Sequence, residues 1–152
     1  MPRHRMGLLN DVQVTVVNLY APNTNQYDFI RKGLQQVDKQ KSGHIFWYCP
    51  ALSQYWQQIQ DTIKSKLGKQ LPLKPEHYLL HMLPRDLTAY EAALTTHITL
   101  AAKTCIAALW KTTTVPDINA VLAKVSLTQQ YEQMAHTIAG TLEHYNRTWS
   151  KW

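Results

Sequence analysis

The stretch that decides the fold reads LTAYEAALTTHITLAAKTCIAALWK and spans residues 87–111. Its apolar residues recur alternately every three and four positions, which places their side chains on one face of an α-helix. The members of this stripe are Leu87, Tyr90, Leu94, Ile98, Ala101, Cys105 and Leu109. Thr88 and Glu91 have the spacing of a capping box, and Pro116 follows the threonines that end the pattern. We therefore expect a long helix from about Leu87 to Lys111.

The segment before this helix shows the same spacing. Pro50 suits a first helical position, and Gly68 suits a helix C-cap. The stripe between them consists of Leu52, Tyr55, Trp56, Ile59, Ile63 and Leu67. We expect a helix over this range, then a connector with a short helix between Pro75 and Pro84.

The last segment begins at Pro116 and carries two stripes. The first consists of Ile118, Val121, Leu122 and Val125, after which Ser126 and Gln129 have the spacing of a second helix start. The second consists of Leu127, Tyr131, Met134, Ile138, Leu142, Tyr145 and Trp149, at heptad-like spacing. A coiled coil fits this spacing, but a core-facing helix of a bundle is the commoner cause and is what we expect.

The first forty residues differ in character. The stretch VTVVNLYAPNTNQYDF, residues 14–29, predicts a strand that ends at Pro22, because proline has no N–H for a sheet ladder. Asn10 and Asp11 could form the turn of a hairpin, and a helical pattern follows Pro22. No later segment alternates with period two. We expect a mainly α protein: an irregular bundle of about five helices with a short N-terminal β-hairpin or lone strand.

Composition sets the broad class. The chain has 152 residues, of which 45% are hydrophobic and 17% charged, which is enough for one packed core and argues against disorder throughout. The basic N-terminus is not followed by the apolar segment of a signal peptide, so we expect no secretory signal, and no apolar run approaches the roughly 20 residues of a membrane span. Two cysteines, Cys49 and Cys105, make no disulfide framework. We expect an intracellular protein, cytoplasmic or nuclear, without membrane contact.

Two parts of the chain resemble one family. The residues VNLYAPNTNQYDF, 17–29, resemble the endonuclease part of LINE-type (non-LTR) retrotransposon polyproteins, which has the apurinic-endonuclease-like fold. By motif, the family's active-site tyrosine and nearby asparagine correspond to Tyr20 and Asn23. The stretches GHIFWYCPALSQYWQQI (43–59), LAAKTCIAALWK (100–111) and EHYNRTWSKW (143–152) resemble the region after the reverse transcriptase.

The resemblance implies two units, residues 1–40 from the endonuclease and residues 41–152 from the helical C-terminal region. These regions normally flank most of the endonuclease and all of the reverse transcriptase, so it implies a non-catalytic remnant of an internally deleted polyprotein. The family's metal-binding glutamate, GDFN turn and SDH triplet are missing, and no Asp-Asp pair exists for polymerase metals. We expect no enzyme activity. The other interpretation is an unrelated small α-rich protein.

Metal ligands are incomplete. His44 and Cys49 match the second half of the family's zinc knuckle, but no cysteine precedes Cys49, and structural zinc needs four ligands. His77 and His81 are four residues apart, with Tyr78 where a zinc protease has glutamate. We expect no metal and no cofactor.

Basic residues suggest a second candidate function. The net charge is +6, and four lysines cluster around the end of one predicted helix, Lys64, Lys66, Lys69 and Lys74, with Arg85 beyond them. Cations favour a helix C-terminus, so a solvated basic face is the simpler interpretation. The alternative is a phosphate-contacting patch, which would make the chain a small basic accessory module with weak, sequence-nonspecific RNA or DNA binding.

Overall fold

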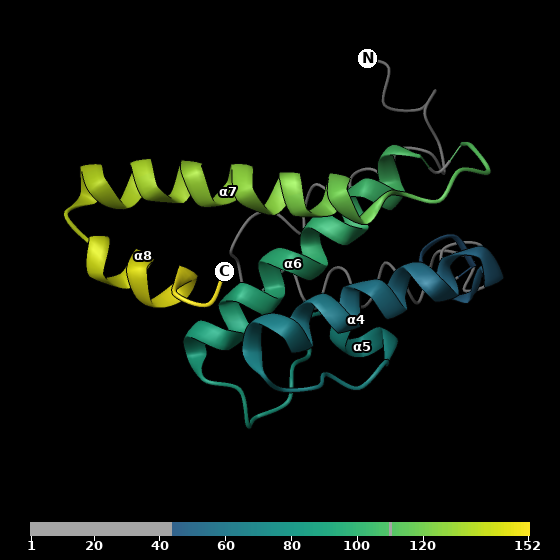
Figure 1. Ribbon diagram of the computed structural model, residues 1–152, viewed down its shortest axis with the longest axis horizontal. Helices are drawn as coiled ribbons and strands as arrows, with labels where there is room; N and C mark the ends of the chain where they lie inside the picture. Colours follow the sequence, from purple (N-terminus) through teal and green to yellow (C-terminus); the bar gives the residue numbers. More distant parts are fainter. Residues whose placement is uncertain (1–43, 110) are drawn as a thin grey trace, which may run out of the picture.

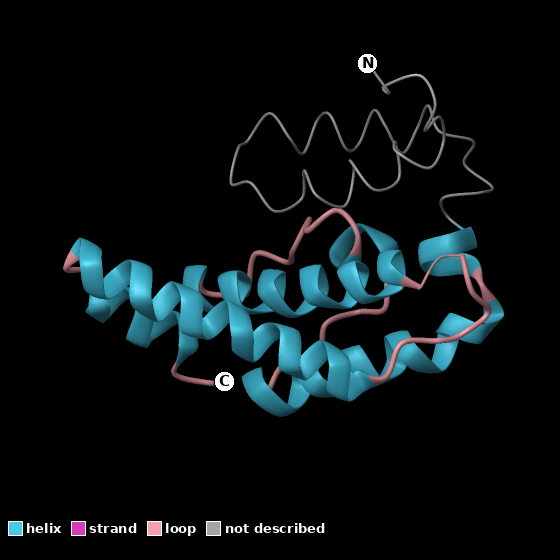
Figure 2. Ribbon diagram, turned by 90° about the horizontal axis from the view of Figure 1, so that it is seen from above, coloured by secondary structure: helices cyan, strands magenta, loops and turns pink. Residues whose placement is uncertain are grey.

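The computed structural model describes residues 44–109 and 111–152. The predicted N-terminal strand, the unit at 1–40, and Tyr20 and Asn23 lie outside these residues. Within them a π-helical turn η2 (His44–Tyr48) and a 3-10 turn η3 (Pro50–Leu52) precede five α-helices, and no strand occurs in this part of the chain (Figure 2). The helices are α4 (Ser53–Leu67), α5 (Pro75–Tyr78), α6 (Ala89–Ala108), α7 (Ile118–Ala139) and α8 (Leu142–Trp149). The prediction of a mainly α protein is confirmed.

Helix α6 is the central helix of the fold. It contacts α4, α5, α7 and α8. Figure 1 shows α7 along one side of the molecule, α8 folding back beside it, and α6 crossing between these two and α4. The chain end returns to the middle of the molecule, where Lys66 Nζ of α4 donates to Trp152 O at 2.7 Å.

The predicted boundaries of α4 and α6 are nearly right, and local caps account for the start of α6 and the end of α4. Thr88 is the N-cap of α6: Glu91 N donates to Thr88 Oγ1 at 3.1 Å, and Thr88 N donates to Glu91 Oε2 at 3.0 Å. The helix therefore begins at Ala89, two residues later than expected, and ends at Ala108, three residues earlier. Gly68 is the predicted C-cap of α4, with a left-handed φ of 68° that glycine adopts without strain.

The core lies between α4 and α6. All six members of the predicted α4 stripe are buried, as are Leu94, Ile98, Ala101 and Cys105 of the α6 stripe. Polar ends of the core aromatics bond to backbone: Tyr55 OH donates to Ala102 O, and Trp56 Nε1 donates to Phe46 O, both at 2.7 Å. These bonds let large aromatic rings fill the core without leaving a polar atom unpaired.

The C-terminal segment corrects two predictions. α7 runs without interruption through Ser126 and Gln129, so no second helix starts there. The helix instead ends at Ala139, with Gly140 as a C-cap whose φ is 70°, and α8 then reverses direction (Figure 1). Tyr145 and Trp149 are buried as expected. The other five members of the second stripe are exposed: Leu127, Tyr131, Met134, Ile138 and Leu142.

The reason for this error is the turn at Gly140. A straight helix would have kept all seven residues on one line, but the reversal gives α7 and α8 separate faces. Only the α8 part of the stripe turns toward the other helices. Among the described helices, none combines the length and the apolar character needed to cross a bilayer.

Candidate functional site

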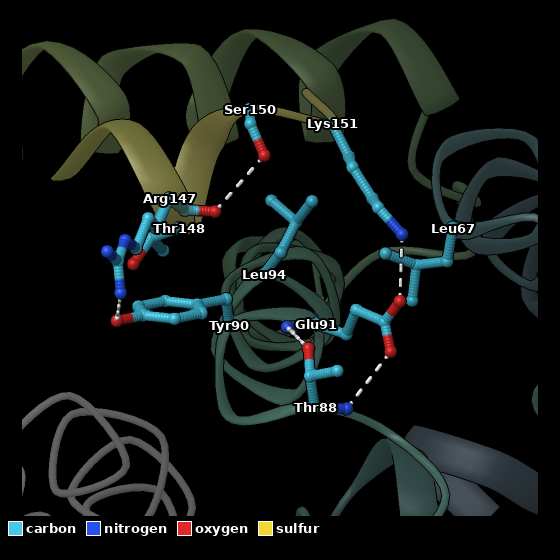
Figure 3. A pocket seen from close by; sticks show the side chains of 9 residues that line it. All are labelled: Leu67, Thr88, Tyr90, Glu91, Leu94, Arg147, Thr148, Ser150 and Lys151. Atoms are coloured by element: carbon cyan, nitrogen blue, oxygen red, sulfur yellow. Dashed lines mark hydrogen bonds and ion pairs between the residues drawn. The ribbon is translucent and has the colours of Figure 1, made fainter. Parts of the chain in front are cut away.

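A hollow of about 290 Å³ lies between the N-terminus of α6 and the end of α8. Figure 3 shows the nine residues that line it: Leu94 lies in the middle of the view, and polar side chains form a rim around it. They are Leu67, Thr88, Tyr90, Glu91, Leu94, Arg147, Thr148, Ser150 and Lys151. Residues far apart in the chain meet here because α8 returns across the start of α6.

Glu91 is the electrostatic centre of this hollow. Its carboxylate accepts from Lys151 Nζ and from Lys69 Nζ, each at 2.8 Å, and from the Thr88 backbone N–H. The Glu91 side chain is only 7% exposed, whereas the side chains of Lys69 and Lys151 are 40% and 45% exposed. The bonds from Lys151, Lys69 and Thr88 lower the pKa of Glu91 to about 2. One carboxylate thus ties α6 to the α4–α5 connector and to the chain end.

Arg147 forms the other side of the rim. Its guanidinium pairs with Glu143 one turn earlier in α8 and donates to Tyr90 OH at 3.4 Å. The bond to Tyr90 and the charge of Glu143 raise the pKa of Arg147. The Tyr90 ring also meets the His144 ring at 5.5 Å between centroids. The charged and aromatic groups of this side of the rim therefore contact one another within the protein. Thr148 and Ser150 lie next to them.

Two of the five predicted basic residues have intramolecular partners. Lys69 pairs with Glu91, as described above. Lys66 Nζ bonds to Trp152 O and lies 4.7 Å from the centre of the Trp152 ring. Lys64 is two positions before Lys66, and therefore roughly 200° away around the helix axis. The two lysines project from different sides of α4.

The other three predicted cations, Lys64, Lys74 and Arg85, are exposed. They make no ion pair among the described residues. Their side chains are open to solvent, as phosphate contacts require, and their binding to nucleic acid stays a prediction.

The predicted half of a zinc knuckle falls at the edge of the described chain. Cys49 is half-buried and packs against the hydrophobic core, and His44 opens the η2 turn. In residues 44–109 and 111–152 no three His, Cys, Asp or Glu side chains come close enough to hold a metal ion. His77 and His81 do not share a helix face, because α5 ends at Tyr78.

A buried lysine was not foreseen. Lys103 is 2% exposed, and its Nζ donates to Leu79 O at 2.9 Å and lies 2.8 Å from His81 Nε2. His81 has a left-handed φ of 55°, which is uncommon for a residue with a side chain. Burial lowers the pKa of Lys103 well below its usual value, and burial together with Lys103 lowers the pKa of His81 to about 2. Lys103 lies between members of the α6 stripe in the sequence but does not belong to it, so no local pattern predicts its burial.

A second polar contact joins three helices. Glu132 of α7 accepts from Trp149 Nε1 of α8 at 2.6 Å, and its other oxygen lies 2.9 Å from His97 Nε2 of α6. The His97 and Trp149 rings stack with centroids 4.9 Å apart. Burial raises the pKa of Glu132, but the bonds from His97 and Trp149 outweigh burial, and the net direction is down. These residues are 17 to 52 positions apart, so only the fold brings them together.

The class that these observations define is a mainly α-helical protein built around one central helix. No protein-family model, curated protein or solved structure matches the chain.

Proposed function

We propose that this chain is a non-catalytic remnant of an internally deleted LINE-type retrotransposon polyprotein, whose helical part persists as a self-supporting module. One observation carries the proposal: buried or half-buried ionisable side chains of the described helices bond one element to another. Glu91 joins α6 to the chain end, Glu132 joins α7 to α6 and α8, and Lys103 joins α6 to the connector after α5.

Such engagement counts against catalysis by these groups. A general base or nucleophile must reach a substrate atom at hydrogen-bond distance, with a pKa near the working pH. Glu91 has a pKa of about 2 and is surrounded by its own cations, and Lys103 is enclosed. The sequence supplies the rest of the argument, since the carboxylates that the family uses around Tyr20 and Asn23 are missing.

The test is nuclease activity of the full chain. Supercoiled plasmid incubated with Mg²⁺ or Mn²⁺ should remain uncut, because the hard carboxylate ligands for these ions are missing from the family positions. The matched control is Tyr20→Phe, which removes one hydroxyl. Metal-dependent nicking that disappears in Tyr20→Phe would show that the endonuclease part is active.

A second candidate is a small basic accessory module that binds RNA or DNA weakly and without sequence preference. The observation in its favour is the exposure of Lys64, Lys74 and Arg85 together with the net charge of +6. Released counterions make such binding strongly dependent on salt.

The corresponding experiment measures fluorescence anisotropy of a labelled single-stranded RNA over a range of salt concentrations. Removal of one phosphate-contacting charge, by Lys64→Gln, Lys74→Gln or Arg85→Gln, should reduce the salt slope by about one unit. Lys124→Gln on α7 removes the same charge elsewhere and should leave the slope unchanged. Equal effects of all four substitutions would mean that the charge acts without a defined patch.

We also infer an intracellular location, cytoplasmic or nuclear. Both cysteines are free thiols, which suits a reducing compartment.

A further inference from the structure

The second half of α7 presents an exposed surface, here called the α7 apolar face. It consists of Leu127, Tyr131, Met134, Ile138 and, just after the turn, Leu142. Their exposed fractions are 47, 62, 62, 87 and 41%. The first half of the same helix is different, since Val121 and Val125 are completely buried. Large apolar side chains that gather on one exposed line indicate a surface that another molecule covers.

The α7 apolar face carries no charge. Glu132 and His136 are the only Asp, Glu, Lys, Arg or His residues between Leu127 and Leu142, and both bond within the protein. Glu132 bonds to His97 and Trp149, and His136 bonds to Thr141 Oγ1 at 2.7 Å. A nucleic acid or an anionic membrane surface would call for cations on this face, whereas a neutral apolar face meets an identical face without like-charge repulsion.

The spacing of these side chains suits a helix pair. The steps from Leu127 to Tyr131, Met134 and Ile138 are four, three and four residues, as at the a and d positions of a coiled coil. In two copies related by a two-fold axis, the α7 apolar face of one copy would pack against the α7 apolar face of the other. The side chains of each would insert between those of the other as knobs into holes.

The exposed area is adequate for such a pair. The exposed fractions amount to about three fully exposed apolar residues for each copy. Two copies would then bury on the order of 1,000 Å², which is the size at which specific interfaces begin. We infer that the α7 apolar face is the interface of a homodimer, and that its occupant is the same face of a second copy of this chain. This inference is independent of the proposed function.

The test is the molar mass of the full-length chain, by sedimentation velocity or by light scattering after gel filtration. The wild-type chain should change from monomer to dimer at protein concentrations between about 1 and about 100 µM. Ile138→Glu places a carboxylate at the most exposed position of the face, twice in a symmetric pair, and should weaken the dimer by at least about 100-fold.

The matched control is Gln133→Glu, which adds the same charge to the same helix. Gln133 is exposed and lies roughly 130° around α7 from the centre of the apolar face. The control should dimerise like the wild type, and circular dichroism should show equal helix content in all three proteins. A wild-type monomer at about 100 µM would overturn the inference, as would a dimer that Ile138→Glu leaves intact.

A disulfide crosslink tests the dimer interface independently, in case Ile138→Glu lowers the helix content. Met134 lies near the middle of the face, and the central residue of a symmetric interface meets its own copy. Met134→Cys should therefore form a disulfide-linked dimer on mild oxidation, whereas Gln133→Cys should not. Equal crosslinking of the two variants, or none in either, would overturn the inference.

Discussion

Helices α6 and α7 are alike in sequence and unlike in the structure. They have 20 and 22 residues, and each carries an apolar stripe at helical spacing. α6 buries side chains along most of its length, whereas α7 buries only Val121 and Val125. α6 lies in the middle of the other helices, and α7 lies at their edge (Figure 1). The comparison teaches that periodicity identifies a face, while the position of the helix in the fold determines whether that face is covered.

The largest expected effect comes from one pair of substitutions. Ile98 of α6 is completely buried and Ile138 of α7 is 87% exposed. Ile98→Ala should lower the free energy of unfolding by about 2–5 kcal/mol, because it removes packed methyl groups and leaves a cavity. Ile138→Ala should change it by less than about 0.5 kcal/mol in dilute, monomeric protein. Urea unfolding of both variants measures the difference, and equal losses would contradict the contrast between the helices.

The next effect concerns the charge that anchors the start of α6. Glu91→Gln should cost about 2 kcal/mol at neutral pH, because the carboxylate loses its charge-assisted bonds to Lys69 and Lys151. The folded pKa of Glu91 is lowered from 4.5 to about 2. Its stabilising effect is therefore complete above pH 4.5 and is lost as the pH falls through about 2.

Thermal melts of wild type and Glu91→Gln across this pH range provide the measurement. The difference between the two proteins should shrink as the pH falls below 4.5. Glu143→Gln is the control, because Glu143 is 79% exposed and its pair with Arg147 lies on the surface. A difference that does not depend on pH would contradict the role assigned to Glu91.

A smaller effect concerns the buried lysine of α6. The unfolded chain keeps a proton on Lys103 up to about pH 10.5, whereas burial lowers the pKa of the folded amine. The unfolded state therefore binds more protons over the window between the two values, and stability should rise with pH there. The gain is at most about 1.4 kcal/mol for each pH unit.

Lys103→Met keeps an unbranched side chain, one atom shorter, and removes the ionisable amine. Its stability relative to wild type should fall as the pH rises from 8 to 9. Lys124→Met on α7 is the matched control, because Lys124 is only partly buried. A wild-type protein whose stability does not rise relative to Lys103→Met would show that the buried amine keeps its proton in the fold.

The smallest effect tests the turn that separates α7 from α8. Gly140 has a φ of 70°, and a Cβ added there would meet no atom within 4 Å. Gly140→Ala should therefore cost about 1 kcal/mol, from backbone strain alone. Gly68→Ala after α4 offers the same geometry, with a φ of 68° and open space, and should cost the same. No cost at Gly140 would mean that α7 does not end in a left-handed residue.

Much of the local structure could be predicted because its causes are local. The capping box joins Thr88 to Glu91 three residues later, and Gly68 ends α4 by its own backbone freedom. The α4 stripe from Leu52 to Leu67 repeats within a few turns, and all its members are buried. These signals need no knowledge of the rest of the chain.

The candidate site could be predicted only in part. Lys69 belongs to it, and its charge marks it as a candidate binding residue, but the spacing of its partner Glu91 predicts only a helix cap. Lys151 reaches the same carboxylate from 60 residues away, and no spacing rule links the two. The burial of Lys103 could not be predicted, because it depends on partners about 22 to 24 residues away in the sequence. Leu79 O and His81 Nε2 bond to its amine, and these bonds offset the cost of burying it.

The amino-acid sequence by itself determined the start of α6, the end of α4 and the residues that form each stripe, because caps and periodicity act over three or four residues. The tertiary structure alone decided which stripes are covered. Tyr145 and Trp149 continue the α7 pattern in sequence, yet the turn at Gly140 buries them and leaves Leu127 to Ile138 exposed. Burial depends on which element lies opposite, and that is set by contacts between residues distant in the chain.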